Sequence, residues 1–179
     1  MARNIEIKAR IACVEALIPR AAAVADHGPE LIEQDDTFFP CPNGRLKLRA
    51  FSADQGQLIF YSRPDQTGPK ESFYILSPTA SPDTLRAALV SAHGERGRVR
   101  KVRTLFLVGR TRVHLDRVEG LGDFLELEVV LREGEPAEAG VAEAHGLMAR
   151  LGVNHDALIE GAYVDLLTSD QATRAGRGA

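Results

Sequence analysis

Polar and apolar residues alternate along most of this chain. Because successive side chains of a strand point to opposite faces of a sheet, a period of two predicts strands. Glycine and proline bound most of the alternating runs and mark the turns between them. Eight strands are predicted, over residues 4–11, 31–39, 45–52, 57–63, 70–76, 98–108, 111–117 and 123–132.

Helical segments interrupt the alternation. Ser81 and Pro82 suit the N-cap and the first position of one helix, and Gly28-Pro29 is a stop signal after another. Helices are predicted over residues 14–26, 82–93, 135–151 and, for a short last helix, 157–167. No linker divides the chain, so residues 1–168 are expected to form one domain. Residues 169–179 are small and polar and are expected to form a disordered tail.

The polar rows of these strands consist almost wholly of ionisable residues. Leu46 and Leu48, for example, alternate with Arg45, Lys47 and Arg49. Each such strand therefore has one apolar face, which the helices can cover, and one charged face. The charged faces can point to bulk water, since antiparallel sheets often have one solvated face.

Two features favour a closed barrel over an open, solvated sheet. The charges segregate by strand, with Lys47 and Arg49 in one row and Glu126 and Glu128 in another. Eight strands also suffice to close a small barrel with room for a ligand. The predicted fold is therefore α+β, an eight-stranded antiparallel closed barrel with helices packed outside. Charged rows inside it are tolerated only if the charges pair or a charged ligand fills the lumen.

The charges expected in the lumen favour an anionic ligand. Nine are basic: Lys8, Arg10, Lys47, Arg49, Arg63, Lys70, Lys101, Arg103 and Arg112. Four are acidic: Glu6, Asp116, Glu126 and Glu128. The surplus of five positive charges suits a triphosphate, which carries about four negative charges that arginine can bind in bidentate fashion. The carboxylates suit Mg²⁺ or Mn²⁺, which prefer oxygen ligands.

The segment Asn4-Ile5-Glu6-Ile7-Lys8 resembles the ExExK signature of the CYTH superfamily, named for CyaB-type class IV adenylyl cyclases and thiamine triphosphatase. The resemblance covers nearly the whole chain and is greatest to the CyaB-type branch. It continues through residues 34–39, 44–49, 58–63, 101–103, 112–116, 120–128 and 163–167.

This resemblance implies a triphosphate tunnel, a bound Mg²⁺ or Mn²⁺, and a substrate such as ATP. The metal ligands it implies are Glu6, Glu126, Glu128 and Asp116. The phosphate-binding residues it implies are Lys8, Lys47, Arg49, Arg63, Lys70, Lys101, Arg103 and Arg112. Catalytic roles would fall to Glu126, Glu128, Lys8, Arg112 and Asp116.

Three functions remain open at this point. The favoured one is a class IV adenylyl cyclase, which converts ATP to cyclic AMP and pyrophosphate. The second is a triphosphatase that hydrolyses tripolyphosphate, thiamine triphosphate or a nucleotide. The third is a binder of a phosphorylated small molecule without catalysis. Asn4 stands where the signature has its first glutamate and would suit that third function, because asparagine offers a metal no charge.

Composition bears on which other partners and which cellular compartment are expected. The chain has 22 basic and 25 acidic residues, so a global basic field for nucleic acid is absent. Its apolar stretches are too short to cross a membrane, and the start of the chain has no signal-peptide pattern. Cys13 and Cys41 lack partners at metal-ligand spacing and are expected to be free thiols in a cytoplasmic protein. The resemblance adds a homodimer as an expectation.

Overall fold

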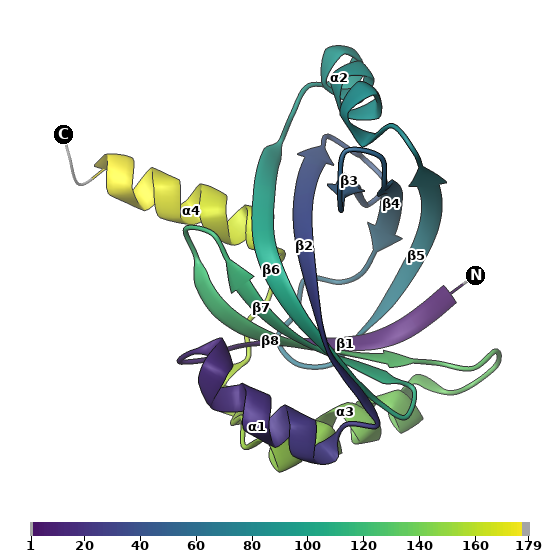
Figure 1. Cartoon of the computed structure of the whole chain (residues 1–179), viewed down its shortest axis with the longest axis vertical. Coiled ribbons are helices and arrows are strands. Elements are labelled where there is room, and N and C mark those ends of the chain that lie inside the picture. Colours follow the sequence, from purple (N-terminus) through teal and green to yellow (C-terminus); the bar gives the residue numbers. More distant parts are fainter. Residues whose placement is uncertain (1, 177–179) are drawn as a thin grey trace.

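The computed structural model describes residues 2–176 and the side chains of residues 3–169. Figure 1 shows a ring of strands with helices on its outside. The strands are β1 Ala2–Arg10, β2 His27–Phe39, β3 Arg45–Ala50, β4 Gly56–Ser62, β5 Lys70–Thr79, β6 Gly97–Val108, β7 Thr111–Val118 and β8 Gly122–Val130. The helices are α1 Val14–Val24, α2 Pro82–His93, α3 Ala137–Leu151 and α4 Tyr163–Gly176, with a 3₁₀ turn, η1, at His155–Ala157.

The eight strands form one closed antiparallel sheet in the order β1-β5-β4-β3-β2-β6-β7-β8. β1 closes the ring because it pairs with both β5 and β8, which places Glu6 beside Lys70 on one side and Glu128 on the other. The predicted eight-stranded closed antiparallel architecture is confirmed. Every polar row that faces inward is thereby brought into one lumen.

The first half of β2 differs from the prediction. The strand begins at His27, ahead of the predicted start at residue 31, because the long β6 supplies partners as far as Leu107. The register shifts between His27 and Glu30, across Gly28-Pro29. The Gly-Pro stop signal therefore gave no indication of the first residues of β2, which form a strand because they pair with β6.

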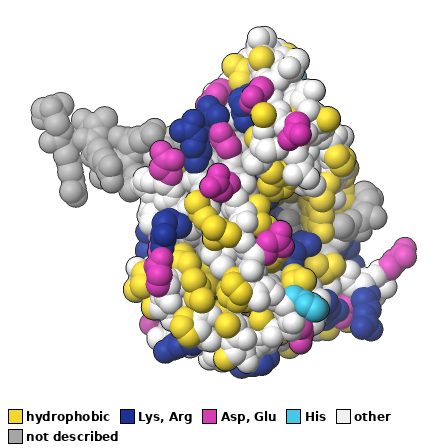
Figure 2. All heavy atoms as spheres, in the orientation of Figure 1, with side chains coloured by type: hydrophobic (Ala, Val, Ile, Leu, Met, Phe, Trp, Pro, Cys, Tyr) yellow, Lys and Arg dark blue, Asp and Glu magenta, His cyan; other side chains and the backbone are white. Residues whose placement is uncertain are grey.

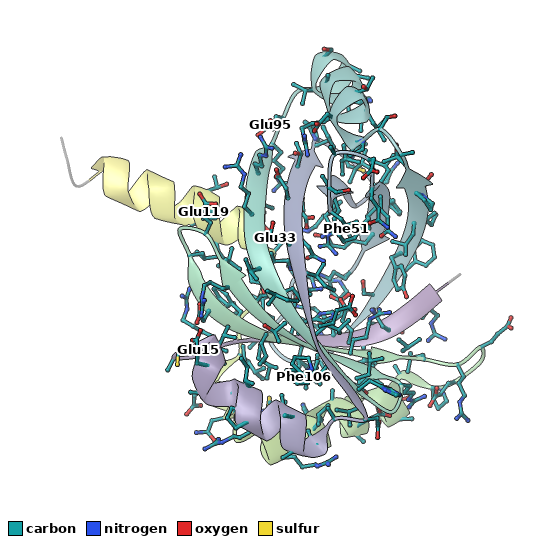
Figure 3. All side chains as sticks on the ribbon, in the orientation of Figure 1. Glu15, Glu33, Phe51, Glu95, Phe106 and Glu119 are labelled. Carbon is teal, nitrogen blue, oxygen red and sulfur yellow. The ribbon has the colours of Figure 1, made fainter. Side chains whose placement is uncertain are left out.

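Helices α1 and α3 cover the apolar outer face of β1, β7 and β8 (Figure 1). The fully buried Phe106 lies in this core beneath the ring (Figure 3). The carboxylate of Asp123 accepts the N–H of Val14 at 2.8 Å and so satisfies a free donor at the start of α1. These strands are the ones that carry the acidic rows, so the core gives the acidic rows a rigid support.

The last helix starts later than predicted. The expected helix over residues 157–167 is wrong in its first half, because the chain pairs with the end of β1 at that point. Leu158 bridges Ala9, and the N–H of Ile159 donates to the carbonyl of Lys8 at 2.9 Å. Helix α4 then begins at Tyr163, and a second apolar cluster packs around it on β2, β4, β6 and β8.

The predicted disordered tail over residues 169–179 stays a prediction. Helix α4 continues to Gly176, and residues 177–179 lie outside the part of the chain that the structure describes. Within the described residues, no helix combines the length and the hydropathy that a bilayer crossing needs. Cys13 and Cys41 are both free thiols.

Candidate metal and phosphate site inside the strand ring

The ring encloses a cavity of about 310 Å³ that receives side chains from all eight strands. Figure 2 shows a hollow in this face of the molecule, with hydrophobic atoms along its wall and Lys or Arg atoms at its base. The apolar part of the lining includes Ile32, Phe51, Leu76 and Leu105. The remainder is largely charged, so the cavity has an apolar portion and a strongly polar one.

The acidic cluster lies where β7 and β8 pair. Glu126 and Glu128 alternate along β8 and both point inward, and His114 on β7 is the register partner of Glu126. Nδ1 of His114 lies 4.0 Å from Oε2 of Glu126 and 3.9 Å from Oε1 of Glu128. One ligand atom from each of these three residues falls within 4.8 Å of the others. This is a geometry that a single cation can bridge.

Both glutamates are ionised at neutral pH despite their burial. Burial raises the pKa of Glu126, but the charges of Lys8, Lys101 and Arg103 outweigh it and hold that pKa well below its usual range. Lys8 Nζ lies 2.9 Å and Arg103 Nη2 lies 2.7 Å from the Glu126 carboxylate. For Glu128, burial is likewise outweighed by charged neighbours, Arg112 and Arg103 among them, and its pKa is lowered. Two negative charges are therefore held ready for a cation.

Glu6 faces the same cavity and forms an ion pair with Arg63. Burial raises the pKa of Glu6, and Arg63 opposes that effect while Glu128 and Glu126 add to it through repulsion. Asn4, two residues earlier in the same row, is buried, and its Oδ1 has no hydrogen-bond partner among the described residues. The structure thus brings Glu6, Glu126 and Glu128 together, as the sequence predicted.

Asp116 is placed differently from the position expected beside the metal. It is fully buried, and it lies outside the cavity lining. Lys101 donates to it at 2.7 Å, Arg103 donates twice at 2.7 Å, and the hydroxyl of Tyr163 donates at 3.1 Å. Because Asp116 lies outside the lining and accepts four hydrogen bonds, three of them at Oδ2, we leave it out of the metal set proposed below. It instead orients Lys101 and Arg103 toward the cavity.

Most of the predicted phosphate-binding residues meet in the cavity. Those that line it are Lys8, Lys47, Arg49, Arg63, Lys101, Arg103 and Arg112. Lys70 is buried but lies outside the lining, with its Nζ donating to the carbonyl of Gln66 at 2.9 Å. Arg10 was expected in the lumen, and this is wrong. It lies exposed beyond the cavity, donating to the carbonyl of Leu121.

Sequence reasoning missed Asp36 as a lumen residue. Its carboxylate is buried and accepts hydrogen bonds from Lys47 at 2.8 Å and from Arg49 at 2.7 Å twice. Burial opposes its ionisation, but Arg49 and Lys47 hold its pKa far below the usual range. The alternation of Gln34, Asp36 and Phe38 was the available signal, since Asp36 is the register partner of Arg49. With Asp36 added and with Arg10, Lys70 and Asp116 outside it, the cavity lining carries seven basic and four acidic residues, a surplus of three.

Tyr163 also went unassigned in the sequence and lies in the wall of the cavity. Its ring centroid is 3.9 Å from Nζ of Lys8 and 4.9 Å from Nζ of Lys101, within the range of cation–π attraction. The carbonyl of Gly161 accepts from Lys8 at 3.4 Å. The segment that leads into α4 therefore fixes the position of two of the lumen's ammonium groups.

Comparisons with known proteins identify the family and the fold. The CYTH domain family matches residues 2–163. Among solved structures, PH1012 protein from Pyrococcus horikoshii OT3 is 22% identical with a TM-score of 0.82, and the match covers 92% of this chain and 99% of that one. No curated protein matches the chain in sequence.

Two further solved structures carry names that bear on activity. One is a protein from Vibrio parahaemolyticus that is predicted to be an adenylate cyclase, at 18% identity and a TM-score of 0.71, covering 92% of this chain and 97% of that one. The other is HpAC1 from Hippeastrum, an adenylyl cyclase candidate with a dominant triphosphatase activity, at 16% identity and a TM-score of 0.66, covering 95% and 96%. At these identities the structural likeness shows the fold alone, whereas the family match spans nearly the whole sequence. The chain belongs to the CYTH domain family.

Proposed function

We propose that this protein is a metal-dependent adenylyl cyclase that converts ATP to cyclic AMP and pyrophosphate. Members of the CYTH family are enzymes that act on triphosphate substrates with divalent metal ions. The observation that carries the proposal is one cavity in which ionised Glu126 and Glu128 face a wall of seven basic side chains. Carboxylates for a cation and bases for phosphate oxygens are the two components that phosphoryl chemistry requires.

The acidic cluster fits a divalent cation. Glu126, Glu128 and Glu6 would hold it, and the unpartnered Nδ1 of His114 faces one oxygen of Glu126 and one of Glu128. When bound, the metal would supply charge stabilisation at the reacting phosphate and would activate the attacking hydroxyl. Neutralising Glu126 and Glu128 in this way would also relieve the repulsion that both exert on Glu6.

The basic residues would bind the phosphate chain and stabilise the charge of the leaving pyrophosphate. In the cyclase reaction the ribose 3′-oxygen forms a bond to the α-phosphorus while the bond from that phosphorus to the pyrophosphate oxygen breaks. Arginine offers paired N–H groups to phosphate oxygens, and Arg49, Arg103 and Arg112 project into the cavity. Donors fixed in advance cost no reorganisation as the charge develops. Asp36 and Asp116 provide that fixation through their ion pairs with the basic wall.

A triphosphatase is the second candidate. The same side chains could direct water to the terminal phosphorus if the phosphate chain of the substrate lay at a different depth in the cavity. HpAC1, whose fold this chain shares, has a dominant triphosphatase activity. The candidate substrates are tripolyphosphate, thiamine triphosphate or a nucleotide. A binder without catalysis is the third candidate, and neutral Asn4 in the cavity wall is the feature that favours it.

One assay separates the three. The protein is incubated with Mn²⁺ and, in separate reactions, ATP, thiamine triphosphate and tripolyphosphate, and the products are resolved. Cyclic AMP with an equal amount of pyrophosphate supports the cyclase. Orthophosphate without cyclic AMP rejects the cyclase and supports the triphosphatase. Tight binding without any product rejects both enzymes.

Replacing Lys47 by alanine is expected to weaken triphosphate binding about tenfold or more, because one charge-assisted hydrogen bond contributes about 1.5–3 kcal/mol. The turnover number should change less than the binding constant, since Lys47 lies on β3, across the ring from the acidic cluster on β8. Calorimetric titration with ATP, beside steady-state kinetics, checks this. Arg98→Ala is the control, because Arg98 pairs with Asp35 outside the cavity; an equal loss in both variants would contradict the assignment.

Binding should also weaken as the pH rises above 7. Burial, helped by the charge of Arg49, lowers the pKa of Lys47 to about 7. Its ammonium group is thus present below pH 7 and is lost in the ligand-free protein above it, while a terminal phosphate, with a pKa of about 6, is already ionised. Affinity measured from pH 6.5 to 9 should fall by up to about tenfold per unit. In Lys47→Met the part of the decline centred near pH 7 should disappear; an unchanged profile would contradict this role.

A further inference from the structure

A ring nitrogen in the cavity wall, Nδ1 of His114, has no hydrogen-bond partner among the described residues. His114 is 3% exposed, and its Nδ1 forms no hydrogen bond to any described residue. Its other ring nitrogen, Nε2, lies 3.5 Å from Nη1 of Arg103. A buried polar atom left unpaired costs about 1–3 kcal/mol, so its place in a folded protein needs an explanation.

The surroundings of Nδ1 are those of a cation site. The nearest oxygens, on Glu128 and Glu126, lie 3.9 and 4.0 Å away, which is too far for hydrogen bonds. These distances suit an ion between the three groups, because ligand atoms about 2.1 Å from a common ion lie about 3–4 Å apart. One ligand atom from each of the three residues lies within 4.8 Å of the others, so a single ion between them can contact all three.

The carboxylates keep an oxygen available for that ion. Glu128 uses Oε2 for Arg112, at 2.8 and 2.7 Å, and presents Oε1 to His114. Glu126 binds Lys8 through Oε1 and Arg103 through Oε2, and a carboxylate oxygen has a second lone pair to offer. The cationic neighbours therefore hold the carboxylates in place without using every acceptor site.

The imidazole can offer Nδ1 as a ligand. In the neutral tautomer with its proton on Nε2, the lone pair lies on Nδ1, which faces the two carboxylates. Arg103 can only donate, so this tautomer gives up the contact between Nη1 and Nε2, which at 3.5 Å is at the outer limit of a hydrogen bond. The ring therefore exchanges one weak contact for a bond to the ion.

We propose that Nδ1 of His114 is a metal ligand beside Glu126 and Glu128, so that the site is a mixed nitrogen and oxygen site that selects Mn²⁺ over Mg²⁺. The inference rests on the metal centre of the proposed function and adds a ligand to it. Mg²⁺ strongly prefers oxygen ligands, whereas affinity for sites with imidazole is greater for the transition metals. The neighbouring Asn4 adds no charge to this wall.

Pulsed electron paramagnetic resonance of the whole protein with Mn²⁺ alone tests the inference. A ¹⁴N coupling from imidazole should appear, and it should change to the ¹⁵N pattern when histidine is labelled with ¹⁵N. His114→Gln should lose the coupling and bind Mn²⁺ about 10–100-fold more weakly, with a much smaller change for Mg²⁺. His93→Gln is the control, because His93 is exposed at the end of α2 and should leave coupling and affinity unchanged.

The outcomes separate this inference from the proposed function. Bound Mn²⁺ without histidine coupling, in the labelled wild-type protein, overturns the role of His114 and leaves the acidic centre intact. Mn²⁺ binding that is absent, or that is unchanged in Glu126→Gln, overturns the metal centre and the inference with it. Because the labelling test uses the wild-type protein, a folding defect in His114→Gln would not obscure the result.

Discussion

Replacing Glu126 by glutamine is expected to lower the turnover of a triphosphate by a factor of about 1,000, while the protein stays folded. The substitution keeps the shape of the side chain and removes its charge. Glu126 lies at the centre of the site, within 2.9 Å of Lys8 Nζ, 2.7 Å of Arg103 Nη2 and 4.0 Å of His114 Nδ1. Its loss removes charge from the cation site and leaves two buried cations without their carboxylate.

The control for this variant is Glu119→Gln. Glu119 is exposed at the turn between β7 and β8 and lies outside the cavity (Figure 3), so its rate should match that of the wild-type protein. Chelation of metal from the wild-type protein should reproduce the loss seen in Glu126→Gln. Rates are measured under saturating substrate, with circular dichroism to verify folding. Wild-type turnover in Glu126→Gln would refute the metal assignment.

Replacing Asp36 by asparagine is expected to lower the free energy of unfolding of the ligand-free protein by about 3–5 kcal/mol. Its carboxylate is the counter-charge of Lys47 and Arg49, and both of these side chains are largely buried. Without it, two adjacent cations remain in the wall of the lumen. Because the folded-state pKa of Asp36 is depressed, this stabilisation is present above its unfolded pKa of about 3.9 and is lost as the pH falls below that value.

Asp35→Asn is the matched control, one residue earlier on β2. Asp35 faces the outside of the ring, where it pairs with the exposed Arg98, so its loss should cost at most about 1 kcal/mol. Urea unfolding of both variants, with and without tripolyphosphate, measures the difference. The ligand should restore stability to Asp36→Asn more than to wild type, since phosphate oxygens can replace the lost carboxylate. Equal losses in the two variants would contradict the counter-charge role.

The architecture could be predicted because its signal is local. Ionisable rows such as Lys47 and Arg49, each alternating with leucine, specify both a strand and a face, and eight of them suffice for a ring. The start of β2 could not be predicted in the same way, because that strand forms by pairing with β6. The late start of α4 has a similar cause, since the end of β1 holds residues 158 and 159 in extended form.

The sequence predicted which residues of the candidate site share one face of a strand. It predicted less well which of them form ion pairs with one another. Glu126 and Glu128 belong to one row, and the structure keeps them together. Which carboxylate faces a cation and which holds an arginine depends on depth within the ring, and the sequence has no signal for depth. Asp116 was predicted to be a metal ligand and is left out of the proposed metal set, because it lies outside the cavity lining and accepts hydrogen bonds from Lys101, Arg103 and Tyr163. Asp36 went unassigned for the same reason.

The most direct test of the central claim, that the lumen binds a triphosphate chain, is calorimetric titration of the wild-type protein with ATP, ADP and AMP. Chelator is present so that no turnover occurs, and only the number of phosphates changes along the series. If each phosphate engages separate basic side chains, as we propose, the dissociation constant should rise by about tenfold or more for each phosphate removed. Equal affinity for ATP and AMP would contradict the account.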